Sequence, residues 1–200
     1  MGDPRVTFFF DLGSPYAYLA AERIHGVFAE RDLEPPEWQP ILLGGLFKRF
    51  DRGSWAGTPE REAGIAEVER RARAYGLPEL RWPDPFPGNT LAAMRAAVFA
   101  KETGRTVAFA LAAFRQAFAA GHDLSDIEYV LLAAAACELH PNAVSKAIET
   151  SSVIEALREA TERAGDLGVK GVPSVAVGDE VFWGDDRLEE AAEAASAHRG

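Results

Sequence analysis

The pattern of apolar and polar positions predicts alternating strands and helices at the start of the chain. Val6 to Asp11 (VTFFFD) is a short run of β-branched and aromatic residues, which predicts a buried strand. Helical spacing begins after Ser14-Pro15 and continues to about Arg31. Trp38 to Leu43 predicts a second strand, in which Pro40 suits an edge or a strand start. The expected order here is strand, helix, strand.

A long block of helical patterns without strand signals follows. Gly and Pro residues separate its segments, as is typical of helix ends and loops. Ser125 with Glu128 matches a capping box, which predicts the start of a helix that ends near His140. The predicted helices of the block are Glu60–Tyr75, Thr90–Thr103, Thr106–Ala120, Ser125–His140, Asn142–Thr150 and Ser152–Ala164.

Strand patterns return near the end of the chain. Val175–Val177 and Val181–Trp183 flank Gly178-Asp179, which is a favourable two-residue turn. Asp185 or Asp186 is predicted to cap a final helix that reaches about His198. Because neither strand pair would be stable alone, all strands are expected to share one sheet. The chain therefore predicts an α/β fold, with the helical block as a lid or subdomain.

Composition and charge narrow the class of protein. With 200 residues and 48% hydrophobic content, the chain is long enough to build a substantial core. Its 31 acidic and 21 basic residues give a formal net charge of −10. Such a surface repels phosphate backbones and anionic lipids, so neither a nucleic acid nor a membrane is an expected partner. No signal-peptide or membrane-span pattern is present, and we expect a cytoplasmic protein.

The chain contains a single cysteine, Cys137. One thiol cannot form an intramolecular disulfide, a CxxC redox pair or a cysteine-based zinc site. The four histidines are scattered without the spacing of metal ligands. We therefore expect no metal site.

Ser14-Pro15-Tyr16 stands where the first predicted strand meets the first predicted helix. A hydroxyl at a helix N-cap lies beside unpaired backbone N–H groups and the positive end of the helix. That position stabilises an anion, including a thiolate brought by a ligand. Serine followed by proline is also a common way to start a helix, so a purely structural cap is the alternative.

Two later segments are further candidates. Gly171–Ser174 (GVPS) precedes the third strand, and a cis bond before its proline would free the Val172 backbone to pair with an extended ligand. An ordinary trans turn is the alternative. Asp185 and Asp186 suit the start of a helix, yet together with Arg187 they could also recognise an ammonium or a carboxylate group.

Lys48, Arg49 and Arg52 form a basic cluster in an otherwise acidic protein. Such a cluster can receive an anionic substrate. A solvated helix face is the alternative interpretation.

Taken together, three segments resemble one known family. They are FDLGSPYAYLA at Phe10–Ala20, GVPS at Gly171–Ser174 and FWGDDRL at Phe182–Leu188. In this order they resemble the 2-hydroxychromene-2-carboxylate isomerase family, which is similar to kappa-class glutathione transferases and to DsbA-type thioredoxin-like proteins. GNTLAAMRA at Gly88–Ala96 also looks like a helix start of this family. The resemblance covers nearly the whole chain.

The resemblance implies a thioredoxin-like fold with a large all-helical insertion, the DsbA and kappa-class architecture, usually in a homodimer. Residues 1–45 and 166–200 would form the thioredoxin-like domain, and residues 46–165 the helical insertion. In that family a serine replaces the first redox cysteine and holds the glutathione sulfur as a thiolate, which matches Ser14. With Ser14 and Ala17 in place of the two cysteines, disulfide exchange is not expected.

The resemblance also implies the reaction and its ligands. Family isomerases interconvert 2-hydroxychromene-2-carboxylate and a trans-benzylidenepyruvate in aromatic catabolism, through reversible thiol addition, bond rotation and elimination. The cofactor would be glutathione, with another low-molecular-weight thiol as the alternative. The residues expected to bind it are Tyr16, Val172, Pro173, Asp185, Asp186 and Arg187, and those expected to receive a small aromatic carboxylate substrate are Lys48, Arg52 and Trp183.

The chain departs from the family pattern after Gly45. It keeps Lys48 but lacks the clear Asn of that region and the Tyr of the following helix, and Asp185 stands where close isomerases often have Asn. Two other functions stay open. One is a kappa-type glutathione S-transferase, and the other is a non-catalytic thioredoxin-like binding protein in which Ser14 only caps its helix.

Overall fold

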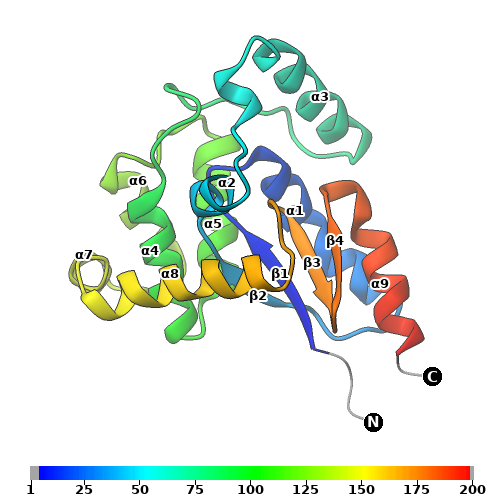
Figure 1. Cartoon of the computed structure of the whole chain (residues 1–200). Coiled ribbons are helices and arrows are strands. Elements are labelled where there is room, and N and C mark those ends of the chain that lie inside the picture. Colours follow the sequence, from blue (N-terminus) through cyan, green and yellow to red (C-terminus); the bar gives the residue numbers. More distant parts are fainter. Residues whose placement is uncertain (1–4, 199–200) are drawn as a thin grey trace.

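Strands from both ends of the chain form one mixed sheet. The computed structural model describes residues 5–198. Its sheet has the order β2–β1–β3–β4 (Figure 1). β1 (Val6–Phe10) runs parallel to β2 (Glu37–Pro40) and antiparallel to β3 (Ser174–Val177), which pairs antiparallel with β4 (Glu180–Trp183). The predicted α/β class and the shared sheet are confirmed.

The core gathers around β1, which lies inside the sheet. Phe8 and Phe10 are fully buried, and both rings pack edge-on against Trp38 of β2, at centroid distances of 4.8 and 5.6 Å. An inner strand is covered on both faces, which explains a nearly continuous apolar run in place of alternation.

Helices cover both faces of the sheet. α9 (Leu188–Ala197) contacts β3 and β4 and packs beside α1 (Pro15–Ala29). α8 (Ser151–Asp166) contacts β2 and crosses in front of the sheet in the view of Figure 1. The C-terminal end of β1 and the N-terminal end of β3 both face the top of that view, and the candidate site lies beside them.

All the remaining α-helices of residues 5–198 lie between β2 and β3. They are α2 (Leu43–Arg49), α3 (Arg61–Ala74), α4 (Leu91–Glu102), α5 (Thr106–Phe118), α6 (Ile127–Ala136) and α7 (Pro141–Ala147). The helices predicted over 60–75, 90–103, 106–120, 142–150 and 152–164 are confirmed within a few residues. α3 stands apart from the sheet, at the top of Figure 1. Within residues 5–198 no helix combines the length and apolar character that a bilayer crossing requires.

The second strand is shorter than predicted. β2 ends at Pro40, and the predicted strand end at Leu43 is the first residue of α2 instead. The reason is a tertiary contact, because Oδ2 of Asp11 accepts a hydrogen bond from the Leu43 N–H at 2.8 Å. A carboxylate from the end of β1 thereby occupies the place of a local helix cap.

The predicted capping box at Ser125 is wrong. Asp126 is the N-cap of α6, and its Oδ1 accepts a hydrogen bond from the Glu128 N–H at 2.9 Å. The Ser125 N–H donates instead to Oδ1 of Asp123 at 2.9 Å. The carboxylate one residue further along thus displaces the serine as the cap.

The helix α6 also ends earlier than predicted. Its last residue is Ala136, and Glu138 just beyond it has a positive φ of 64°, which interrupts the helix. His140, the predicted end, is the N-cap of the next helix and accepts a hydrogen bond from the Asn142 N–H at 3.2 Å.

Candidate active site

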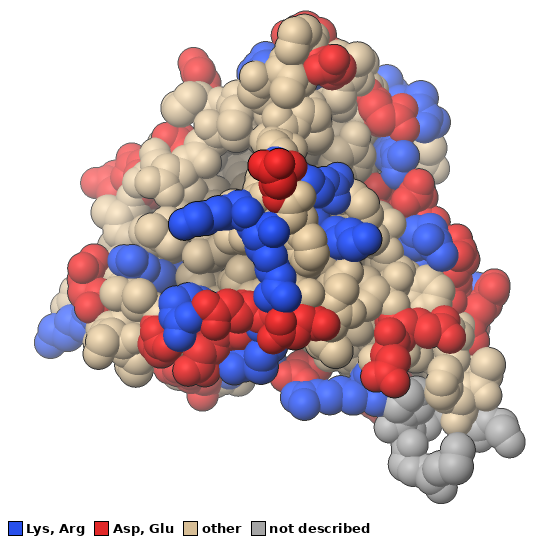
Figure 2. Space-filling model, viewed as in Figure 1, with Lys and Arg blue, Asp and Glu red and all other residues tan. Residues whose placement is uncertain are grey.

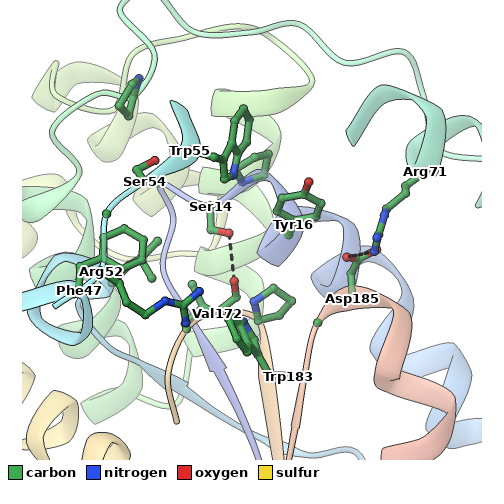
Figure 3. A pocket seen from close by; sticks show the side chains of 18 of the residues that line it. Ser14, Tyr16, Phe47, Arg52, Ser54, Trp55, Arg71, Val172, Trp183 and Asp185 are labelled. Carbon is green, nitrogen blue, oxygen red and sulfur yellow. Dashed lines mark hydrogen bonds and ion pairs between the residues drawn. The ribbon is translucent and has the colours of Figure 1, made fainter. Parts of the chain in front are cut away.

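A cavity of about 370 Å³ opens beside the N-terminus of α1. Its walls come from the β1–α1 junction, from the segment 43–87, from the loop before β3 and from the segment after β4 (Figure 3). The predicted site residues that line it are Ser14, Tyr16, Arg52, Val172, Pro173, Trp183, Asp185 and Asp186. Residues far apart in the sequence thus meet in one place.

Ser14 is the N-cap of α1. Its Oγ accepts a hydrogen bond from the Ala17 N–H at 3.2 Å, and Pro15 occupies the first helical position. The hydroxyl also donates to the carbonyl oxygen of Val172 at 3.5 Å, the outer limit of a hydrogen bond (Figure 3). Only 4% of Ser14 is exposed. The Ser14 hydroxyl, at the floor of the cavity, therefore donates only a weak hydrogen bond.

The loop before β3 faces Ser14. The Val172–Pro173 peptide bond is cis, and the Val172 N–H donates to no acceptor within residues 5–198. The carbonyl of Pro173 accepts a hydrogen bond from the Gly184 N–H at 3.0 Å, which ties this loop to the residue after β4. At Gly171 a Cβ atom would lie 2.8 Å from Nε1 of Trp183, so only glycine permits this approach.

A buried carboxylate, Asp11, supports the floor of the cavity. Its Oδ1 accepts hydrogen bonds from the Gly13 N–H at 2.8 Å and the Thr90 hydroxyl at 3.2 Å, and its Oδ2 accepts from Leu43. Burial raises the pKa of this carboxyl above its ordinary value of 3.8. Asp11 connects the segment before Ser14 with the starts of α2 and α4, a role that was not predicted from the sequence.

Asp185 lies at the opposite, polar end of the cavity and is only 1% exposed. Its Oδ1 accepts a hydrogen bond from Nη1 of Arg71 at 2.8 Å, and its Oδ2 accepts from the Tyr75 hydroxyl at 2.9 Å. Burial raises the pKa of Asp185 above 3.8, and burial together with Asp185 raises that of Tyr75 to about 12. Tyr75 is therefore a neutral hydroxyl donor at physiological pH.

The predicted capping of the last helix by Asp185 or Asp186 is wrong. A short 3₁₀ turn, η2 (Asp185–Arg187), leads into α9, which has no side-chain cap. Tertiary contacts engage both carboxylates: Arg71 binds Asp185 as above, and its Nη1 also lies 3.1 Å from Oδ2 of Asp186. The side chain of Asp186 is 55% exposed and faces the same cavity.

Arg71 and its neighbour Glu67 come from α3, and neither was a candidate in the sequence analysis. Nε of Arg71 donates to Oε1 of Glu67 at 2.8 Å. Hydrogen bonds from Arg70 and from Arg71 lower the pKa of Glu67 to about 2. A cation from the helical segment is thus held at the wall of the cavity by carboxylates of two separate elements.

The outer wall of the cavity is largely aromatic. Trp55 lies in the 3₁₀ helix η1 (Trp55–Gly57) and packs against Phe86 at 5.9 Å and Tyr16 at 6.2 Å between ring centroids. Gly64 of α3 makes room for it, since a Cβ there would lie 2.2 Å from the Trp55 ring. Trp55, Gly64 and Phe86 were not among the site residues predicted from the sequence.

Arg52 adds positive charge to this wall. Its guanidinium lies 4.4 Å from the centre of the Trp183 ring and donates to the carbonyl of Lys170 at 3.3 Å. No carboxylate within residues 5–198 forms an ion pair with it. The cavity therefore offers a cation beside aromatic surfaces.

Two predicted site residues do not line the cavity. Lys48 lies along a separate cleft between α2 and α8, together with Arg158. Arg187 pairs with Glu190 at 2.6 Å and lies over the Phe182 ring. Figure 2 shows basic side chains gathered in the middle of the viewed face, over α2, whereas α8 below carries charges of both signs.

Comparisons with known proteins agree with this architecture. A family model of the DSBA-like thioredoxin domain matches residues 5–196. The curated 2-hydroxychromene-2-carboxylate isomerase of Sphingobium xenophagum is 28% identical over 191 residues, which cover 92% of this chain and 94% of that protein.

Two solved structures show the same fold. A 2-hydroxychromene-2-carboxylate isomerase structure has a TM-score of 0.81 at 23% identity, over 94% of this chain and 93% of that one. A probable DsbA oxidoreductase from Streptomyces coelicolor has a TM-score of 0.74 at 22% identity, over 98% of this chain and 90% of that one. The predicted resemblance and the thioredoxin-like fold with its helical insertion are confirmed, and the chain belongs to the DSBA-like thioredoxin domain family.

Proposed function

We propose that the protein is a glutathione-dependent isomerase of a small aromatic carboxylate, such as 2-hydroxychromene-2-carboxylate. One observation carries the proposal: the Ser14 hydroxyl, at the N-terminus of α1, lines a cavity whose outer wall combines aromatic rings with the Arg52 cation. Similarity to the Sphingobium xenophagum isomerase along nearly the whole chain supports it.

The nucleophile has to come with a ligand. Cys137, the single cysteine of the chain, is buried after the end of α6 and does not line the cavity. Burial raises the pKa of its thiol, which makes it a poor nucleophile. Bound glutathione would supply a thiolate, whose reversible addition turns a substrate double bond into a single bond that can rotate.

The residues around Ser14 fit such a thiolate. The hydroxyl can leave its long contact with Val172 and donate to sulfur, while the positive end of α1 favours the negative charge. The unpaired N–H of Val172 suits an acceptor from an extended ligand backbone. These groups stabilise the anion without being consumed.

The outer wall of the cavity suits an aromatic carboxylic acid. Trp55 and Phe86 offer apolar ring surfaces, and Arg52 offers a guanidinium that can bind a carboxylate. Arg52 already lies over Trp183, which limits the freedom of its guanidinium. This chain would thus hold its substrate by stacking and by one ionic contact.

The test is an isomerisation assay with the purified full chain. We expect 2-hydroxychromene-2-carboxylate to equilibrate with its open-chain trans isomer only when glutathione is present, without net consumption of glutathione. Accumulation of a glutathione conjugate would instead indicate the transferase. If the folded protein neither binds glutathione nor accelerates the reaction, the proposal is wrong.

A further inference from the structure

The helix α3 carries a glycine that its backbone does not require. Gly64 lies inside α3 and has no positive φ. Glycine inside a helix is less favourable than alanine, so packing has to explain its presence here. The Trp55 ring fills the space that a side chain at position 64 would take. Gly64 therefore forms a recess in α3 that receives an aromatic ring of the cavity wall.

The ring fits closely into this recess. A Cβ atom at position 64 would lie 2.2 Å from Cε3 and 2.4 Å from Cζ3 of Trp55, both in the six-membered ring of the indole. Ordinary van der Waals contact of a Cβ atom starts only at 3.4 Å. A methyl group at position 64 would therefore displace either the Trp55 ring or α3.

The free side of the Trp55 ring faces the cavity. Trp55 lines the cavity and Gly64 does not, so the ring lies between the recess and the cavity (Figure 3). On other sides the ring meets Tyr16 at 6.2 Å and Phe86 at 5.9 Å between ring centroids. Phe86 is only 9% exposed and packs in turn against Phe118. A ring pushed out of the recess would therefore move into the cavity.

The position of the Trp55 ring limits how far the cavity extends on this side. Trp55 and Arg52 belong to the same wall, and Arg52 is the cation proposed to bind the substrate carboxylate. A substrate fixed at its carboxylate has a defined distance in which to place its rings. In an apolar pocket, a change the size of one methylene alters the discrimination between substrates by about tenfold or more.

We propose that Gly64 determines the size of the aromatic ring system that the cavity accepts, because it lets Trp55 recede into α3. Gly64 acts through Trp55 and touches no ligand, so it is a positioning residue for specificity. The cavity then favours a fused-ring aromatic carboxylate over a single-ring one, since a small ring leaves part of the space unfilled. This inference rests on the proposed function and deepens it by restricting the substrate class.

The test compares a single-ring probe, benzoate, with a fused-ring probe, 2-naphthoate. Calorimetric titration of the full chain in the presence of glutathione gives the ratio of the two affinities without any turnover. We expect the wild type to prefer 2-naphthoate, and Gly64→Ala to reduce this preference by about tenfold. Equal binding of both probes by the wild type, or an unchanged ratio in Gly64→Ala, would overturn the inference.

Gly26→Ala is the matched control for the substitution of a helical glycine. Gly26 lies inside α1, and a Cβ atom there would meet no other atom within 4 Å. We expect this variant to keep the wild-type ratio of the two affinities. A similar loss of preference in Gly26→Ala and Gly64→Ala would contradict the assigned role of the recess.

A double-mutant cycle tests whether Gly64 acts through Trp55. Trp55→Leu should shift the ratio further toward 2-naphthoate, because the smaller side chain enlarges the cavity. In that background Gly64→Ala should have little effect, since the ring that it would displace is absent. A full loss of preference without the indole ring would contradict the proposal. If Gly64→Ala alone fails to fold, Trp55→Leu still decides, because an unchanged ratio there would overturn the inference.

The isomerisation assay separates this inference from the proposed function. If the wild type isomerises 2-hydroxychromene-2-carboxylate with glutathione while Gly64→Ala leaves both KM and the probe ratio unchanged, only the role of Gly64 is wrong. If the wild type neither isomerises this acid nor binds either probe, both proposals are wrong.

Discussion

The two walls of the cavity are built in different ways. The inner wall consists of the α1 N-terminus and the loop before β3, where Ser14 and Val172 are buried and anchored to the sheet. The outer wall comes from the segment 47–87, which carries Trp55 and Arg71 and stands above the sheet (Figure 1). The inner wall offers groups that stabilise an anion, whereas the outer wall offers rings and charges that can select ligands.

The supports of the two walls differ as well. Beneath the inner wall, Asp11 binds two backbone N–H groups, so the positions there depend on the main chain. The outer wall is attached through side chains, with Arg71 and Tyr75 bound to Asp185. Substitutions in the inner wall should therefore change mainly kcat. Substitutions in the outer wall should change the affinity for ligands or the stability with which α3 is attached.

The largest effect is expected for Ser14→Ala. Without this hydroxyl a smaller fraction of the bound thiol is ionised at neutral pH, and because each unit of thiol pKa changes that fraction tenfold, we expect kcat to fall by about 10- to 100-fold in the isomerisation assay. Ser54→Ala is the matched control, because Ser54 caps η1 and lines the outer wall of the same cavity. If both variants had similar kcat values, the claim that the inner wall contributes more to catalysis than the outer wall would be wrong.

Arg52→Gln should act on substrate binding instead. Loss of one ionic contact to a carboxylate should raise KM for the aromatic acid by about tenfold and leave kcat nearly unchanged. Lys48→Gln is the control, since Lys48 lies in the separate cleft between α2 and α8. Steady-state kinetics distinguishes the two, and a fall in kcat without a change in KM would contradict the assignment.

Tyr75→Phe tests the attachment of the outer wall. The substitution removes a hydrogen bond to a buried carboxylate and should lower the free energy of unfolding by about 1 to 2 kcal/mol, measured by urea denaturation. Tyr129→Phe is the control, because the Tyr129 ring stacks on His122 and its hydroxyl makes no hydrogen bond within residues 5–198. Equal changes in the free energy of unfolding for the two variants would show that the hydrogen bond from Tyr75 to Asp185 does not stabilise the fold.

The smallest expected effect is the pH dependence of stability that Asp11, beneath the inner wall, contributes. The pKa of Asp11 is higher in the fold than its ordinary 3.8, so the folded state binds this proton more readily than the unfolded state. Its contribution to stability is greatest at low pH and declines as pH rises through the folded pKa. Compared with Asp11→Asn, the wild type should therefore gain stability as pH is lowered from neutral. A difference in unfolding free energy that is independent of pH would contradict this.

The features that sequence could predict are those specified by neighbouring residues. Ser14 caps α1 through a hydrogen bond to a residue three positions ahead, and Gly178 with φ of 58° allows the turn between β3 and β4. A short segment carries all the information for either feature. Local patterns therefore located the inner wall and most of the elements.

The features that sequence could not predict depend on contacts between distant segments. Asp185 resembles a helix cap in its local sequence, but Arg71, 114 positions away, determines its role. Trp55 joins the cavity because Gly64 makes room for it, a fact about packing that no local motif records. Apart from Arg52, the outer wall was missed for this reason, and the end of β2 was misplaced because Asp11 starts α2 from a distance.

The central claim is that Ser14 stabilises the thiolate of a bound cofactor. The most direct measurement is a pH titration of glutathione bound to the wild type and to Ser14→Ala, followed by the ultraviolet absorbance of the thiolate. The account predicts that the wild type lowers the pKa of the bound thiol below its value in free glutathione and that the variant largely restores that value. An equal pKa of the bound thiol in both proteins would contradict the account.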